Sequence, residues 1–256
     1  MPTNNVYGPI ADMYDTYVKV DFDLDFFRGI ATRCSGNVLE LMAGTGRVSE
    51  ALFECNRSLT CLDISREMLS VLMSRFSGGV HTPVVVCADV RSLPLTTSYE
   101  LVVVPFNSFS ELTTVEDQHQ ALREMSRILS ANGKVICTLH NPKVRARSLD
   151  GQKKLLGRYG LGGDRELELW VEGTIDQPSG LARSRQRFRI YNERRELASE
   201  HIQEVQFALI TEATFRDLLR LSGFEVLQLF GDYDASPYDH DTSPYMIWTM
   251  QKAGAV

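Results

Sequence analysis

Two glycines and three acidic residues in the first half of the chain are spaced to bind a nucleoside-containing ligand. Gly44 and Gly46 form a Gly-Thr-Gly turn soon after the apolar run 38–41. Glycines let the backbone come close to a ligand, and the helix that follows offers unpaired N–H groups to an anionic group. Asp63 and Asp89 each follow a later apolar run, and Glu40 precedes the glycine turn.

Each acid suits one part of such a ligand. A carboxylate at Asp63 can accept hydrogen bonds from both ribose hydroxyls, and an acceptor at Asp89 can meet an adenine amino group. Glu40 suits a ligand with positive charge, such as an aminoacyl sulfonium, and ill suits a pyrophosphate. An Asp after a strand is also a common helix N-cap. Three acids at the rim where open α/β sheets bind ligands favour the binding interpretation.

The elements that must position these residues lie between 37 and 141. Short apolar runs alternate there with helical periodicity, which is typical of a parallel sheet with crossover helices. We predict strands that are covered on both faces at 38–41, 59–62, 84–87, 101–104 and 134–139. We predict helices at 48–55, 65–76 and 115–129, the last closed by Gly133. The fold class is therefore α/β, a doubly wound Rossmann-like sheet.

The second half of the chain carries an insertion in this core. The basic, glycine-rich stretch 143–164 predicts a loop or loose helix, and three alternating segments at 166–175, 181–191 and 197–210 predict an antiparallel β meander. A helix at 211–221, ended by Gly223, and two strands complete the core. The expected units are an N-terminal lid and helical segment, a core and an inserted cover, at 1–36, 37–142 with 211–256, and 143–210.

Arginines alternate along one predicted strand of the meander, so their side chains share one face of it. An anion site and a cross-strand ladder with nearby glutamates both explain the pattern, and we favour the ladder. The residues are Arg183, Arg185, Arg187 and Arg189.

Composition narrows the function classes. The chain has 256 residues, 43% hydrophobic and 23% charged, with a net charge of −6. This excludes a fibrous or disordered protein and argues against a nucleic-acid binder, which needs a basic footprint. The five cysteines match no zinc or disulfide framework. Without a signal-like start or an apolar run of about 18 residues, we expect a reduced, cytoplasmic protein with no membrane partner.

A nicotinamide cofactor is the main alternative for the glycine turn. Gly44-x-Gly46-x-x-Ser49 nearly matches the dinucleotide fingerprint, but Ser49 stands where a third glycine or alanine belongs. Glu40 and Asp89 also count against it. An NAD(P)-dependent oxidoreductase is thus the less favoured reading.

At these residues the chain resembles the class I S-adenosylmethionine-dependent methyltransferases. Residues 38–46 are similar to the family's first motif, and the helix and glycine turn at 122–134 to the segment before its fifth strand. The family order implies an antiparallel seventh strand at 245–250. Residues 11–15, the meander and 231–234 resemble N-methyltransferases of glycine or amino sugars. Met42 replaces the usual first glycine, so a cofactor-binding module without catalysis is a further alternative.

The resemblance implies an enzyme that uses S-adenosyl-L-methionine and releases S-adenosyl-L-homocysteine. Methyl transfer to a small-molecule acceptor by in-line displacement needs no metal, and an amine nitrogen is favoured over an oxygen. A homodimer is compatible with it. The residues expected at the cofactor are Tyr14, Glu40, Ala43, Gly44, Gly46, Asp63, Ile64, Met68, Asp89, Val90, Pro105 and Phe106.

Three residues are expected to act at the acceptor. His140 ends the fifth predicted strand, where a base would take the acceptor's proton, although a histidine that only bonds the loop fits as well. Asn107 follows the fourth strand and is expected to orient the acceptor. Tyr14 lies in the N-terminal segment that the family tends to use as a lid, together with Tyr7.

Overall fold

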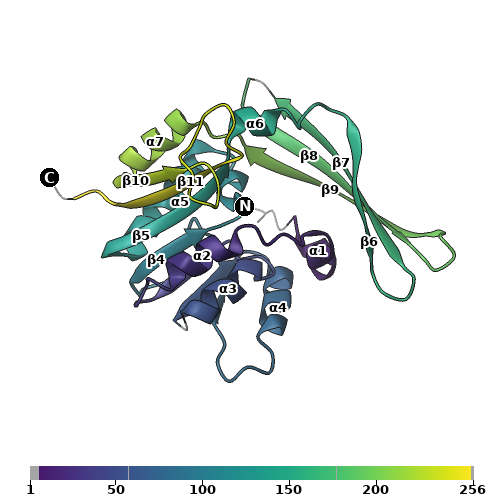
Figure 1. The fold of residues 1–256 in the computed structure, drawn as a ribbon, viewed down its shortest axis with the longest axis horizontal. Coiled ribbons are helices and arrows are strands. Elements are labelled where there is room, and N and C mark those ends of the chain that lie inside the picture. The colour runs from purple at the N-terminus through teal and green to yellow at the C-terminus, as the bar shows by residue number, and fades with distance from the viewer. Residues whose placement is uncertain (1–5, 57, 177, 255–256) are drawn as a thin grey trace.

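The computed structural model describes residues 6–56, 58–176 and 178–254, so residues 1–5 of the predicted N-terminal segment lie outside it. Two separate sheets form the protein (Figure 1). The larger has seven strands in the order β10-β11-β5-β4-β1-β2-β3. Their bounds are β1 Val38–Leu41, β2 Leu59–Asp63, β3 Val84–Cys87, β4 Tyr99–Val104, β5 Leu129–His140, β10 Phe224–Phe230 and β11 Tyr245–Lys252.

Strand directions confirm the predicted topology. β1, β2, β3, β4 and β5 pair in parallel, whereas β11 is antiparallel to both β5 and β10. Each central strand sends alternate side chains to opposite faces. Leu39 packs with α5 (Val115–Ile128) and α7 (Glu212–Leu221), and Val38 packs with α2 (Leu24–Ala31), α3 (Arg47–Cys55) and α4 (Arg66–Arg75). The core is therefore a doubly wound sheet with helices on both faces.

The junction of α5 and β5 differs from the prediction. The helix ends at Ile128 and the strand begins at once with Leu129, so Gly133 lies inside β5 and does not close the helix. Leu129 pairs with Tyr99 of β4, and its carbonyl accepts a hydrogen bond from Lys252 Nζ at 2.7 Å. Tertiary pairing thus extends the strand over residues whose local sequence favours a turn.

The second sheet is the inserted cover, residues 143–210. Its strands β6 (Lys153–Gly160), β7 (Glu166–Asp176), β8 (Leu181–Tyr191) and β9 (Leu197–Ala208) are antiparallel neighbours in that order. The segment 143–164, predicted as a loop or loose helix, begins within α6 (Pro142–Ala146). The prediction is wrong over 153–160, where the edge strand β6 forms. β6 is mostly exposed and its pairing shifts between Leu155 and Gly157, so it lacks the apolar alternation that reveals a strand.

Charge pairs run across this sheet. Arg189 Nε lies 2.7 Å from Glu200 Oε1, and Arg187 Nη1 lies 3.6 Å from the same atom. These two arginines follow the ladder interpretation.

The N-terminal segment joins the core to the inserted cover. The short helices η1 (Gly8–Ile10) and α1 (Ala11–Tyr17) lie against α4, and α1 also lies against β6 (Figure 1). Ile10 packs with Leu167 and Phe188 of the cover. Asp23, fully buried at the start of α2, accepts two hydrogen bonds from Arg47 of α3, at 2.5 and 2.7 Å. In the described part of the chain no helix is long and apolar enough to cross a bilayer.

Candidate functional site

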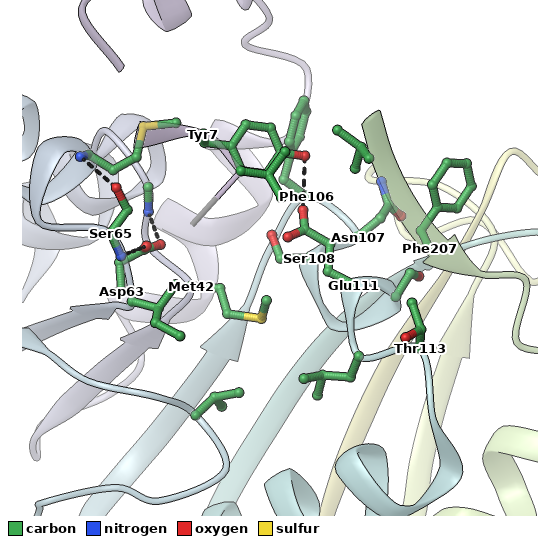
Figure 2. A pocket seen from close by; sticks show the side chains of 18 of the residues that line it. Tyr7, Met42, Asp63, Ser65, Phe106, Asn107, Ser108, Glu111, Thr113 and Phe207 are labelled. Atoms are coloured by element: carbon green, nitrogen blue, oxygen red, sulfur yellow. Dashed lines mark hydrogen bonds between the residues drawn. The ribbon is translucent and has the colours of Figure 1, made fainter. Parts of the chain in front are cut away.

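A cavity of about 590 Å³ lies at the carboxyl ends of the central strands, between the core and the inserted cover (Figure 2). The inserted cover contributes Ser184, Gln186, Val205 and Phe207 to its wall. The predicted site residues that line it are Tyr14, Gly44, Asp63, Ile64, Met68, Asp89, Val90, Phe106, Asn107 and His140. The topology therefore brings together residues from the ends of five strands, β1 to β5, and from the N-terminal segment.

Asp63 and the glycine turn form one structure. Asp63 Oδ2 accepts the N–H of Gly44 at 2.8 Å, and its Oδ1 accepts the N–H of Ser65 at 2.9 Å (Figure 2). Gly44 and Gly46 have φ values of +57° and +86°, and a Cβ on Gly46 would lie 2.6 Å from Leu72 Cγ. Burial raises the pKa of Asp63, while the backbone N–H donors oppose that rise.

Met42 has the left-handed backbone conformation that a glycine adopts easily. Its φ is +58°, in the left-handed region that side chains rarely adopt, and it lines the cavity. A bulky residue in this conformation carries backbone strain. The departure at Met42 therefore places a side chain in the cavity wall at the cost of that strain.

Four of the predicted cofactor residues do not line the cavity: Glu40, Ala43, Gly46 and Pro105. Glu40 lies beneath the turn, is 1% exposed, and accepts a hydrogen bond from Ser49 Oγ at 2.5 Å. Burial raises its pKa to about 8. The residue that broke the dinucleotide fingerprint, Ser49, thus supports the carboxyl group under the glycine turn.

Asp89 lines the cavity and forms an ion pair with Arg91, two residues further along the chain. The Arg91 guanidinium lies 2.6 Å from Asp89 Oδ2, and also 2.8 Å from Asp117 Oδ1. Hydrogen bonds from the Arg91 side chain lower the pKa of Asp89, and the positive charge of Arg91 adds to this effect. Asp89 is therefore ionised and held in place.

The segment after β4 has an unusual backbone. Phe106 and Asn107 are both left-handed, with φ of +56° and +62°. The Asn107 N–H donates to Thr138 Oγ1 at 2.9 Å, and the Arg47 guanidinium lies 4.9 Å from the centre of the Phe106 ring. Asn107 Oδ1 is buried without a hydrogen-bond partner among the described residues. Strain and an unpaired acceptor at a cavity wall are typical of a ligand contact.

His140 and Tyr14 both line the cavity, and each packs against other aromatic rings. The His140 ring lies 6.2 Å from Phe207 and stacks at 6.3 Å on Tyr245. Burial and the charge of Arg145 lower its pKa to about 4, so it is neutral at pH 7. Tyr14 packs edge-on against Tyr7 at 5.9 Å and Tyr17 at 5.3 Å, and burial raises its pKa.

The glycine turn could serve S-adenosylmethionine or a nicotinamide cofactor, and comparison with known families decides between the two. Residues 38–133, from β1 into β5, match the family described as Methyltransferase domain. The match spans Gly44, Asp63 and Asp89. The chain carries a methyltransferase domain.

Curated relatives of this methyltransferase domain match between about two fifths and four fifths of the chain. A demethylmenaquinone methyltransferase of Chlamydia pneumoniae is 32% identical over 111 residues, which are 42% of this chain and 46% of the relative. The cypemycin N-terminal methyltransferase of a Streptomyces species is 27% identical over 202 residues, 78% of this chain and 77% of the relative. The chain spans about half the length of several curated relatives that it matches.

Solved structures match the whole fold, including the inserted cover. A S-adenosylmethionine-dependent methyltransferase from Clostridium acetobutylicum ATCC 824 has a TM-score of 0.81 and 18% identity, covering 98% of this chain and 100% of that one. A sugar N-methyltransferase from Streptoalloteichus sp ATCC 53650 has a TM-score of 0.77 and 15% identity, covering 95% and 93%. The fold is therefore that of the class I S-adenosylmethionine-dependent methyltransferases.

The sequence analysis missed an acid in the wall of this methyltransferase domain. Glu111 ends the short helix η2 (Ser108–Glu111), and its Oε1 accepts a hydrogen bond from Tyr7 Oη at 3.1 Å. Burial and the charge of Asp63 raise the pKa of Glu111 to about 7, although the side chain remains accessible from the cavity. In Figure 2 Glu111 lies between the side lined by Asp63 and the side lined by Phe207. The only signal in the sequence is an acid shortly after a strand end.

Proposed function

We propose that the chain is an enzyme that transfers a methyl group from S-adenosylmethionine to an amine of a small molecule. The observation that carries this proposal is one cavity with two kinds of wall. Gly44, Asp63 and Asp89 line it from the methyltransferase domain, while Ser184 and Phe207 line it from the inserted cover. A cofactor and an acceptor held in one enclosed space meet without water between them.

The residues present fit the cofactor. A carboxylate offers about four acceptor positions, so Asp63, with one backbone N–H on each oxygen, can also accept from ribose hydroxyls. Ile64, Met68 and Val90 offer apolar surface for an adenine ring beside Asp89. The unpaired Asn107 Oδ1 can accept an N–H from either ligand. When bound, S-adenosylmethionine supplies an electrophilic methyl group on a sulfonium.

An amine attacks only after it has lost its proton, and Glu111 is the residue best suited to accept it. A base works best when its pKa lies near the working pH. The pKa of Glu111 is about 7, whereas that of His140 is about 4. Tyr7 occupies Oε1 of Glu111 and leaves Oε2 for the acceptor. In this proposal, His140 is neutral and orients the acceptor through a hydrogen bond.

The preference for nitrogen is supported by two similar proteins described above, one named a cypemycin N-terminal methyltransferase and the other a sugar N-methyltransferase. An oxygen acceptor would use the same wall. The cytoplasmic location, the absence of a nucleic-acid partner and the homodimer expected from the sequence stay predictions.

Calorimetry and product analysis test the proposal together. We expect S-adenosylmethionine and S-adenosylhomocysteine to bind and NAD to leave the heat signal at baseline. Incubation with methyl-labelled cofactor and a panel of small amines and phenols, followed by mass spectrometry, should give N-methyl products. Preferential binding of NAD would refute the methyltransferase assignment, and methylation at oxygen alone would refute the choice of an amine.

A further inference from the structure

One arginine in the cavity wall, Arg145, has no anionic partner among the residues that the structure describes. Arg145 lies on α6, which directly follows His140 and Asn141 at the end of β5. Its Nε is buried and has no hydrogen-bond partner among the described residues. Its Nη1 donates to Ser148 Oγ at 2.9 Å, so the edge formed by Nε and Nη2 is left for a ligand.

Other arginines near this cavity are neutralised by the protein. Arg91 pairs with Asp89 and Asp117, and Arg47 pairs with the buried Asp23. Arg145 makes no ion pair in the described part of the chain, and its contact there is the face of Phe207, 5.3 Å from the ring centre. A cation removed from water without a partner is costly. Burial accordingly lowers the pKa of Arg145.

Arg145 belongs to the acceptor side of the cavity. Phe207, the ring beneath its guanidinium, comes from β9 of the inserted cover, and Ser184 and Gln186 come from β8. Figure 2 places Phe207 across the cavity from Asp63 and Ser65, with Glu111 between them. A group bound at Arg145 is thus held on the side of Glu111 away from the glycine turn.

Building on the proposed function, we infer that Arg145 is an anion-binding subsite and that the methyl acceptor carries a carboxylate or a phosphate beside its amine. The free guanidinium edge matches two oxygens of either group. The acidic Glu111 and the cationic Arg145 then select the two ends of such an acceptor. The cofactor's own carboxylate is the second source of the same chemistry, and the experiment distinguishes the two.

The first arm compares matched acceptors. Amines are offered in pairs that differ in the anion alone: glycine and glycinamide, alanine and alaninamide, glucosamine 6-phosphate and glucosamine. We expect the anionic member of a productive pair to have at least a tenfold higher kcat/KM, and Arg145→Gln to lower its kcat/KM by about 10- to 100-fold. The matched control is Arg147→Gln, on the next turn of chain and outside the cavity lining. Equal use of both members, or a preference that survives in Arg145→Gln, would overturn the inference.

The second arm needs no turnover. With the protein saturated by S-adenosylhomocysteine, the ¹⁵N resonance of Arg145 Nε, assigned by its loss in Arg145→Lys, should shift saturably with acetate or inorganic phosphate at a Kd of about 1 to 10 mM. No shift would refute the subsite even if acceptors are methylated. Calorimetry separates the two sources: S-adenosylhomocysteine should bind Arg145→Gln as tightly as the parent protein, and weaker binding would assign the subsite to the cofactor's carboxylate. A failure of all cofactor binding would instead reject the proposed function.

Discussion

The carboxylate of Asp63 accepts the backbone N–H of Gly44 at 2.8 Å, so the acid at the end of β2 holds the turn at the end of β1. Nineteen residues separate the two in the chain. Because the second oxygen holds Ser65 at the start of α4, one side chain fixes both loops of the cofactor half. Removal of this side chain therefore removes both backbone contacts together with the negative charge.

Replacement of Asp63 tests both of its roles, the support of the two loops and the binding of the cofactor. Asp63→Ala removes both backbone bonds and the ribose acceptor, and we expect the Kd of S-adenosylhomocysteine to rise by about 5- to 150-fold, equivalent to about 1 to 3 kcal/mol. Calorimetry measures it. Asp25→Ala, a change of the same type at an exposed carboxylate of α2, is the control. Unchanged affinity in Asp63→Ala would exclude its contact with the cofactor.

The pH profile of methyl transfer tests Glu111. Its ionised form accepts the proton, so kcat/KM should rise with pH and level off above about 7, the pKa raised by burial and by Asp63. Glu111→Gln should lower kcat/KM by about 10²- to 10⁴-fold and remove that inflection. Tyr7 and Asp63 are the groups that act on its titration. Since the Tyr7 hydrogen bond lowers the pKa, Tyr7→Phe should move the inflection upward.

The control for this profile is His140→Gln, which should keep the inflection, because the imidazole titrates near pH 4. An inflection that persists in Glu111→Gln and disappears in His140→Gln would return the base to the histidine.

Glu40 makes the stability of the unliganded protein depend on pH. Its folded pKa of about 8 lies above the ordinary 4.5, so the folded state binds the proton more tightly than the unfolded chain does. The free energy of unfolding should therefore fall as pH rises from about 5 to 8. Glu40→Gln keeps an acceptor for Ser49 and removes the charge. Denaturant titration should find it more stable than the parent at pH 8, by about 1 to 4 kcal/mol, with a much smaller difference at pH 5.

A comparison of two variants isolates the strain at Met42. Met42→Ala and Met42→Gly both remove the side chain, but only alanine keeps a Cβ at a φ of +58°. We expect the glycine variant to be the more stable of the two by about 1 kcal/mol, as measured by urea denaturation. An alanine variant of equal or greater stability would show that the turn relaxes and stores no strain.

The core could be predicted because its strands are nearly continuous apolar runs. Val38, Leu59 and Leu101 begin such runs, and each begins or lies within an observed strand. Two boundaries could not be predicted. Gly133 is a turn residue in local sequence, yet β4 and β11 pair with the surrounding strand. β6 has exposed side chains on both faces, so only its pairing with β7 makes it a strand.

The site was predictable where a residue follows a strand. Asp63, Asp89 and His140 all line the cavity for that reason. Glu40 lies beneath the glycine turn and accepts a hydrogen bond from Ser49, because pattern alone does not say which face of β1 turns toward the cavity. Glu111 and Arg145 depend on neighbours far away in sequence, Tyr7 and Phe207, which no local motif reveals.

The inserted cover leaves the core after β5 and returns just before α7 as one unbroken length of chain. Arg145, Ser184 and Phe207 belong to that length, whereas Gly44, Asp63 and Asp89 are encoded before it. One wall of the cavity is thus encoded apart from the glycine turn and its two acids. An exchange of that stretch between genes would change the wall and leave Gly44, Asp63 and Asp89 as they are.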